Sequence, residues 1–297
     1  MISPQKQCPS NQLLRSEKRV CPLNSRLPIV ACLLFWALAT CPISWAHTLP
    51  LTDELRAVLP PVSGYLNKQS GDLVIAVPDA IAPYAIAETH RGIEVDIVNA
   101  ALAQQGHRII LKYIPLGRLN HVLMDKTVDG AMTVKEAFID AAPIYFSQQP
   151  HIFYHNVVIS RAEQALDIKG VAALANYSIA VFQNSNSYLG SQWVDMRQQS
   201  RRPISEIANQ KSQIKMLFAK RVDTLVIDLN IFNYYRQQLD HHQATPVSIH
   251  KVFEKNYVKV AFRNEEIARS FDRGLEAIID NGLYQKILMH YRQPFSE

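Results

Sequence analysis

Residues 220–235, KRVDTLVIDLNIFNYY, decide which fold the sequence predicts. The run from Thr224 to Ile227 is short, rich in β-branched residues and bounded by two aspartates, which is typical of a buried strand in a parallel sheet. Asp228 follows at the carboxyl end of this strand, where open α/β sheets bind their ligands. A carboxylate there can pair with a cation or cap the next helix, predicted over Ile231–Leu239, and the pattern leaves both roles open.

The same alternation of strands and helices precedes this stretch. Buried strands are predicted over Leu73–Val77, His107–Tyr113 and Val128–Thr133, with one helix between each pair. Such units form a parallel sheet with crossover helices. The pattern restarts after the polar segment Arg161–Gly170. With 297 residues, 48% of them hydrophobic, the chain can fill one large α/β domain or two lobes with their own cores.

The first 46 residues differ in kind from the rest of the chain. Basic residues precede an uncharged apolar run, Leu27–Ala46, which closes with small residues at Ser44 and Ala46. This pattern predicts a secretory signal that is cleaved before His47, so the mature chain is expected in the periplasm. Two alternatives stay open. The run is long enough to remain as a membrane anchor, and Cys41 could carry the lipid of a lipoprotein.

Removing this segment changes what the composition implies. All four cysteines lie within it, so the mature chain has no disulfide, no thiol nucleophile and no thiolate metal ligand. Of the 31 Lys and Arg residues five lie there, and of the 26 Asp and Glu residues one does, so the mature chain is nearly neutral. A nearly neutral chain argues against nucleic acid as a partner.

Two further positions carry aromatic or polar side chains at strand ends. Tyr84 follows the first strand and Pro83, where it can face a cleft or cover the sheet edge as a rim aromatic. The turn Gln183–Ser187 is rich in Asn and Ser at the start of a helix, where free N–H groups and hydroxyls can hold an anion. Ordinary N-capping explains the same residues equally well.

Six short motifs occur in a fixed order along the chain. They are LVIAV at Leu73–Val77 with Pro83-Tyr84, GIEVDIV at Gly92–Val98, Val128-Asp129, Phe146-Ser147, RVDTLVID at Arg221–Asp228 and NGLYQKI at Asn281–Ile287. This set resembles the type II periplasmic solute-binding proteins, specifically the family that binds polar amino acids for ABC importers (extracellular solute-binding protein family 3). The resemblance spans nearly all of residues 72–292.

The resemblance implies two lobes joined by two crossing strands, with a small polar solute enclosed between them when a hinge closes. Lobe one is expected at residues 72–157 plus 256–297 and lobe two at 158–255, while residues 47–71 are expected to pack loosely on the surface as a leader. The resemblance also implies a monomer without a cofactor, which delivers an amino-acid-like or amine-bearing solute to an ABC permease or a membrane receptor.

Site residues follow from the same resemblance. Tyr84 would stack on the solute, and Asp228 would accept its ammonium group. Asn184 and Ser185 would supply polar contacts from lobe two.

The sequence departs from the family after Thr133. The family places a Thr-x-x-Arg there, whose guanidinium holds the α-carboxylate of the ligand through paired hydrogen bonds. No arginine follows Thr133 at the family's spacing in this chain, and Lys135 and Arg118 are the two residues that could supply the positive charge. A member of the fold that binds another protein instead of a solute is therefore an alternative function.

Enzyme and metal functions have weaker support in the sequence. An enzyme on this scaffold needs an acid–base pair in the cleft, and only Asp228 with Glu136 or His151 could provide it. A metal site would draw on His151 and His155 or on the histidines at 241–242, but no motif joins them. The sequence therefore predicts a binding protein, without a metal and without catalytic activity.

Overall fold

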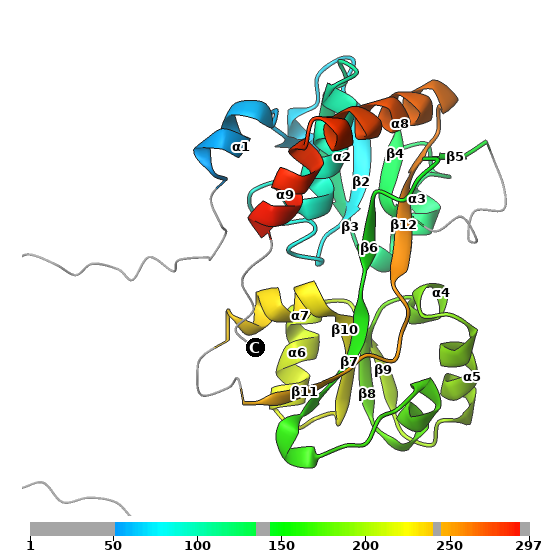
Figure 1. Cartoon of the computed structure of the whole chain (residues 1–297). Coiled ribbons are helices and arrows are strands. Elements are labelled where there is room, and N and C mark those ends of the chain that lie inside the picture. The colour runs from blue at the N-terminus through cyan, green and yellow to red at the C-terminus, as the bar shows by residue number, and fades with distance from the viewer. Residues whose placement is uncertain (1–50, 135–142, 240–244, 292–297) are drawn as a thin grey trace, which may run out of the picture. The chain divides into compact units, whose positions relative to one another are not determined.

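A computed structural model describes residues 51–134, 143–239 and 245–291, which form two β-sheets with helices packed on them (Figure 1). We call the seven-stranded sheet with its helices lobe 1 and the five-stranded sheet with its helices lobe 2. The predicted α/β class is confirmed. Lys135, Glu136 and the histidines at 241–242 lie outside the described residues. Within the described ranges, no helix is long and apolar enough to cross a membrane.

Lobe 1 is built around three parallel strands, β2 (Leu73–Pro78), β3 (Ile109–Ile114) and β4 (Gly130–Val134). The apolar run of β2 is buried in the middle of the sheet, whose order is β1-β3-β2-β4-β12-β5. The other strands are β1 (Ser63–Gly64), β5 (Tyr145–Phe146), β6 (Ile152–Tyr154) and the antiparallel β12 (Asn256–Phe262). The helices are α1 (Asp53–Val58), α2 (Ile93–Ala103), α3 (Leu119–Val122), α8 (Glu265–Asp280) and α9 (Leu283–Tyr291).

The segment expected as a loose leader is part of lobe 1. Leu55 in α1 and Leu59 just after it are 3% and 4% exposed and belong to the lobe 1 core. Residues Ser63 and Gly64 then pair with β3 as an edge strand. The prediction of a loosely packed leader is therefore wrong for residues 51–71.

The close approach of two helices fixes the outer layer of lobe 1. Gly274 in α8 lies directly on α2, and a Cβ atom at this position would overlap the carbonyl oxygen of Ala101. Asn264 caps α8 by accepting hydrogen bonds from the backbone N–H groups of Glu266 and Ile267. The contact between the two helices therefore depends on the absence of a side chain at one position.

Lobe 2 contains the stretch that decided the predicted fold. Its strands are β7 (Asn156–Arg161), β8 (Ile179–Phe182), β9 (Ile204–Ile207), β10 (Thr224–Asp228) and β11 (Val247–His250), in the order β11-β7-β10-β8-β9. The predicted strand 224–227 is confirmed as β10, which is buried and runs parallel to β8. The helices are α4 (Ser185–Tyr188), α5 (Ser191–Gln199), α6 (Gln210–Phe218) and α7 (Leu229–Arg236).

The chain passes between the lobes twice. It leaves lobe 1 at the end of β6 and enters β7 after the single residue His155, and it returns through residues 251–255 into β12 (Figure 1). The end of lobe one, expected at residue 157, thus lies slightly earlier, because residues 156–161 already pair with β10 and β11 inside lobe 2. The segments 152–154 and 156–161 are consequently two strands in two different sheets.

Candidate functional site

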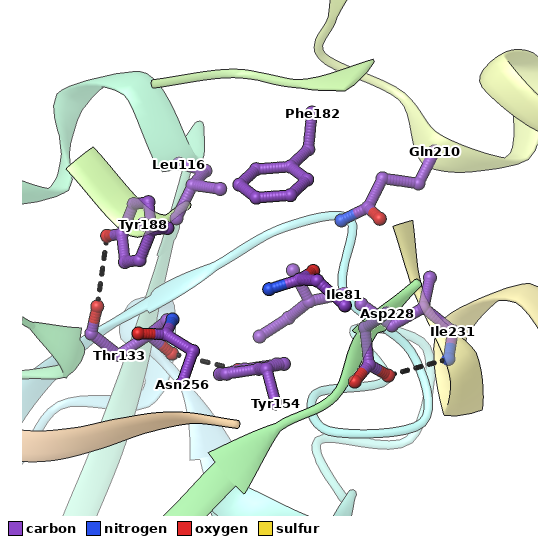
Figure 2. Close-up of a pocket in the computed structure, with 11 residues that line it drawn as sticks. Ile81, Leu116, Thr133, Tyr154, Phe182, Tyr188, Gln210, Asp228, Ile231 and Asn256 are labelled. Atoms are coloured by element: carbon purple, nitrogen blue, oxygen red, sulfur yellow. Dashed lines mark hydrogen bonds between the residues drawn. The ribbon is translucent and has the colours of Figure 1, made fainter. Parts of the chain in front are cut away.

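A cavity of about 30 Å³ lies between the lobes, with room for about one or two water molecules (Figure 2). Both lobes and both crossings contribute to its wall. Apolar and aromatic side chains cover most of it. The polar wall residues are Thr133, Asn156, Gln210, Asp228 and Asn256.

Asp228 is the one wall residue of this cavity that carries a formal charge among the described residues. It is 2% exposed at the carboxyl end of β10. Oδ1 accepts a hydrogen bond from the N–H of Ile231 (3.0 Å) and thereby caps α7, while Oδ2 accepts one from the N–H of His155 (2.7 Å). Burial raises the pKa of this carboxyl to about 6. The side chain therefore caps the helix, which is one of the two roles that the sequence left open, and it also borders the cavity, while pairing with a cation stays a prediction.

Tyr84 lies behind Asp228 and is not a rim aromatic, since only 2% of it is exposed. Its hydroxyl donates to Asp228 Oδ2 (3.3 Å) and accepts from Asn230 Nδ2 (3.0 Å), which joins lobe 1 to lobe 2. Its ring packs against Tyr154, with centroids 4.4 Å apart, and Tyr154 takes the place on the cavity wall. Stacking of Tyr84 on a solute stays a prediction.

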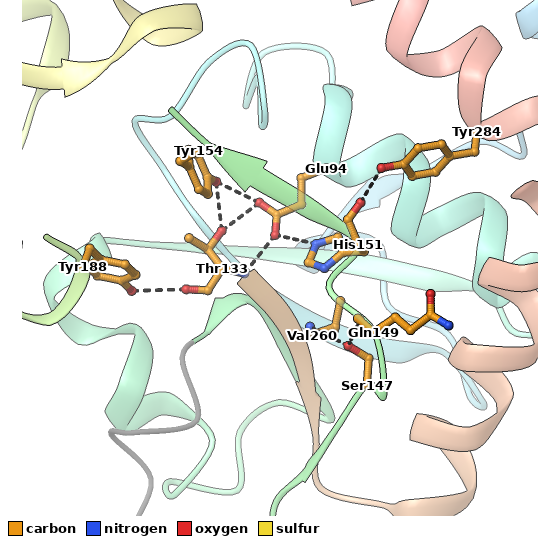
Figure 3. A network of polar contacts seen from close by, with 9 residues as sticks. All are labelled: Glu94, Thr133, Ser147, Gln149, His151, Tyr154, Tyr188, Val260 and Tyr284. Carbon is orange, nitrogen blue, oxygen red and sulfur yellow. Dashed lines mark hydrogen bonds and ion pairs between the residues drawn. The ribbon is translucent and has the colours of Figure 1, made fainter. Parts of the chain in front are cut away.

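Thr133 ends β4 on the cavity wall in a left-handed conformation, with φ of 60°, which is costly for a β-branched residue. Its N–H and hydroxyl both donate to Glu94, at 2.9 and 2.7 Å, and its carbonyl accepts from the hydroxyl of Tyr188 in lobe 2 (3.1 Å; Figure 3). The side chain of Thr133 is therefore directed into lobe 1, and its carbonyl meets lobe 2.

Glu94 organises a fully buried polar network beneath the cavity (Figure 3). Besides Thr133, it accepts hydrogen bonds from Tyr154 (3.1 Å) and pairs with His151 Nε2 (2.8 Å). Tyr284 donates to the carbonyl of His151 (2.8 Å), which ties α9 to the same network. The sequence indicated Glu94 only as a charge at a helix start, because its partners are 39 to 60 residues away.

We expect Glu94→Gln to lower the free energy of unfolding by about 1–3 kcal/mol, because an amide N–H₂ would face buried donors in place of a carboxylate oxygen. Urea unfolding followed by circular dichroism measures this loss. Glu266→Gln on the exposed surface of α8 is the matched control and should change the stability by less than about 0.5 kcal/mol. Equal stability of the two variants would show that the network does not hold Thr133.

Asn184 and Ser185, predicted as contacts from lobe 2, do not line the cavity. Ser185 donates to Glu206 Oε1 (2.8 Å) and accepts from Trp193 Nε1 (3.1 Å). The N–H groups of Asn184 and Ser185 also donate to Glu206, at 3.2 and 3.3 Å. A carboxylate of the chain itself thus occupies the turn that could hold an anion. Asn184 meets lobe 1 through a hydrogen bond from its Nδ2 to the carbonyl of Gly117 (3.4 Å).

Of the two candidates for the missing positive charge, the structure describes only Arg118, which is not on the cavity wall. Arg118 is exposed at the end of the 3-10 turn Leu116–Arg118, from which only Leu116 reaches the cavity. Lys135 lies outside the described residues. Within the described part of the chain, the inner cavity therefore has an acidic group and no basic one.

Three carboxamides on the wall were missed by the sequence analysis. Asn156 and Asn256 begin the two strands that enter from the crossings, and Gln210 is the first residue of α6. All three are buried, and none of their side chains hydrogen-bonds another described residue, Gln210 Oε1 included. Carboxamides both donate and accept, so these groups can bind a polar solute in either sense. Asn156 and Asn256 could have been found from the sequence, because each is a polar residue at the first position of a strand that is entered from a crossing.

Of the two acid–base pairs considered for an enzyme, the one between Asp228 and His151 is not assembled, and Glu136 of the other lies outside the described residues. His151 is fully buried against Glu94 and is absent from the cavity wall, while Asp228 is hydrogen-bonded to other partners. In the described ranges, no three His, Cys, Asp or Glu side chains gather in a way that could hold a metal ion.

No family model and no curated protein matches the chain, but solved structures do. The arginine-, lysine-, histidine-binding protein ArtJ from Geobacillus stearothermophilus is 21% identical with a TM-score of 0.61, over 75% of this chain and 96% of that one. A histidine kinase sensor domain with similarity to periplasmic binding proteins is 15% identical with a TM-score of 0.63, over 74% and 95%. This chain has the fold of the type II periplasmic solute-binding proteins.

A third structure widens the range of functions found on this binding-protein fold. It is the ancestral amino acid-binding protein AncCDT-1, a precursor of cyclohexadienyl dehydratase, at 16% identity and a TM-score of 0.61, over 75% of this chain and 96% of that one. Proteins with this fold thus include a binding protein, a sensor domain and an ancestor of an enzyme.

Proposed function

We propose that residues 47–297 form a secreted binding protein for a small, amine-bearing polar solute, which lies between the lobes with its ammonium group against Asp228. The observation that carries this proposal is a buried carboxylate on the wall of a cavity between the lobes, among three unpaired carboxamides. A carboxylate in such a site favours a cation, since pairing offsets the free energy of burying the charge. Cleavage of the signal before His47 places this protein in the periplasm.

Closure of the lobes about the two crossings encloses the solute. The bound form is then recognised by an ABC permease or by a membrane sensor. The known ligands of ArtJ are amino acids with cationic side chains, which supports an amine in the same class of fold. Catalysis is not part of this proposal, because no acid–base pair lines the cavity in the described residues.

A second candidate function is recognition of a protein partner without a solute. Two observations favour it: the cavity has only about 30 Å³, and Asp228 already accepts hydrogen bonds from Ile231, His155 and Tyr84. In that case closure would present a lobe surface to the partner.

A thermal-shift screen of residues 47–297 against amines, amino acids, organic acids and sugars separates the two functions, because a ligand of the native state raises the melting temperature. A rise with amines supports solute binding, and no rise across the panel favours the protein partner.

The affinity for an amine is expected to depend on pH through Asp228. Burial raises the pKa of this carboxyl to about 6, so its charged form is present above that pH and is lost below it. Affinity should fall about tenfold per pH unit below pH 6 and stay level from pH 7 to 9. The same raised pKa makes the contribution of Asp228 to stability greatest at low pH, and this contribution is lost as the pH rises through about 6. Calorimetric titrations at pH 4.5 to 8.5 measure the binding effect, and a constant affinity over this range would contradict the assignment.

A further inference from the structure

A second and larger cavity opens beside the start of α5. Its volume is about 390 Å³, within the range of small-molecule sites. The wall consists of the first residues of α5 and the residue before them, together with the second crossing, residues 252–256. We call this cavity the outer groove and the cavity at Asp228 the inner cavity.

The two cavities share two wall residues, Tyr188 and Asn256. In Figure 2, both lie at the end of the inner cavity away from Asp228. Asn256 is 7% exposed and borders both cavities, and no hydrogen bond joins its side-chain amide to another described residue. An amide in this position can donate to, or accept from, a ligand that passes between the two cavities.

The described wall of the outer groove combines a helix N-terminus with a lysine, whereas that of the inner cavity has no basic residue. Gly190 precedes α5 with φ of 82°, and no side chain caps this nine-residue helix, so its first N–H groups and the positive end of its dipole face the groove. Lys255 also lines the groove, with its ammonium 4.3 Å from the ring centroid of Phe153. Glu254 is the one acidic residue on the described wall.

We propose that the outer groove binds the carboxylate of a solute whose ammonium lies at Asp228 in the inner cavity. This inference rests on the proposed function, and it identifies the solute as an amino acid whose charged groups are separated along a chain. Asn256 donates to the chain or to the carboxylate where the two cavities meet. The carboxylate then contacts Lys255 and the start of α5. These groups take the role of the arginine that the family places after Thr133.

Straight-chain probes of three to eight carbons test this assignment on residues 47–297 by isothermal titration calorimetry. Three matched series are needed: ω-amino carboxylates, n-alkylamines and n-alkanoates. At the best chain length, the amino carboxylate should bind at least tenfold more tightly than the alkylamine. Lys255→Ala should abolish this gain and leave alkylamine affinity within about twofold, because its side chain is exposed and absent from the wall of the inner cavity. Lys251→Ala, on the same crossing but absent from the groove wall, should keep the gain.

The outcomes separate this inference from the proposed function. If alkylamines bind through Asp228 but the amino carboxylates bind no more tightly, the outer groove is not the carboxylate site, and the proposed amine site stands. If alkanoates bind through Lys255 but no amine binds, the amine site at Asp228 is wrong and the anion site in the outer groove is kept. A Lys255→Ala variant that loses alkylamine and amino carboxylate affinity equally contradicts the inference, as does a series in which no probe binds.

Discussion

Asp228→Asn is expected to weaken the binding of an amine by roughly 100- to 1,000-fold. Removing one charge of a buried, hydrogen-bonded pair costs about 2–5 kcal/mol, and each 1.4 kcal/mol is a factor of ten in affinity. Asparagine caps helices as well as aspartate does, so the hydrogen bond from the N–H of Ile231 to the capping oxygen can be kept. The loss of amine affinity therefore reports the missing negative charge at the cavity more than a change in the cap of α7. Calorimetry at pH 8, with the amine identified by the thermal-shift screen, measures it.

The strand itself supplies a matched control. Asp223 lies just before β10, at its opposite end, and its carboxylate accepts hydrogen bonds from the N–H and hydroxyl of Ser178 at 2.9 and 2.7 Å. It is absent from the cavity wall, so Asp223→Asn should leave amine affinity within about twofold of the unmodified protein. Comparable losses in both variants would mean that the substitutions act through the folding of lobe 2, and an unchanged affinity in Asp228→Asn would remove Asp228 from the site.

The second large effect is expected from Gly274→Ala, which should lower the free energy of unfolding by about 3 kcal/mol. The added Cβ atom would overlap the backbone carbonyl of Ala101, and a backbone atom cannot move aside by a change of rotamer. The helices α2 and α8 would have to separate, which exposes part of the lobe 1 core. Alanine otherwise favours a helix over glycine by about 1 kcal/mol, so a loss of stability in a helix interior would identify the clash.

Gly170→Ala is the control glycine for this comparison. Its φ of −172° is extended backbone that any residue adopts, and a Cβ atom there would have no neighbour within 4 Å. The substitution should change the stability by less than about 0.5 kcal/mol. Urea unfolding of both variants, monitored by circular dichroism, measures the two effects. A Gly274→Ala variant as stable as the control would show that the helices can separate without cost.

The predictable part of the fold comes from the buried strands. Runs such as Leu73–Val77 and Thr224–Ile227 are apolar on both sides because helices cover both faces of each sheet, so local sequence suffices to find them. The switch between sheets at His155 was not visible, because the residues on both sides of it have the same strand propensity. Pairing with β10 and β11 decides where lobe 2 begins, and pairing depends on distant residues.

The position of Asp228 was predictable, because a polar residue at the carboxyl end of a buried strand lies at the edge where ligands bind, and the cavity borders it. Its hydrogen bond to the N–H of Ile231 shows only the capping role of the two that the sequence left open. The role of Ser185 depended on Glu206, a carboxylate 21 residues away that reaches its hydroxyl. Gln210 and the asparagines of the crossings became wall residues only through the arrangement of the lobes. Side chains whose environment is made by tertiary contacts cannot be assigned from neighbouring residues alone.

Besides the bond from Asn230 to Tyr84, three hydrogen bonds between described residues join the lobes: Tyr84 to Asp228, Tyr188 to the carbonyl of Thr133, and Asn184 to the carbonyl of Gly117. Each is made within the chain, so it contributes to the closed arrangement whatever the cavity contains. Part of the protein should therefore be closed at equilibrium before any solute arrives, which raises apparent affinity because less of the binding free energy is spent on closure. A permease or sensor that recognises the closed form would then receive a basal output, and these three bonds would set its level.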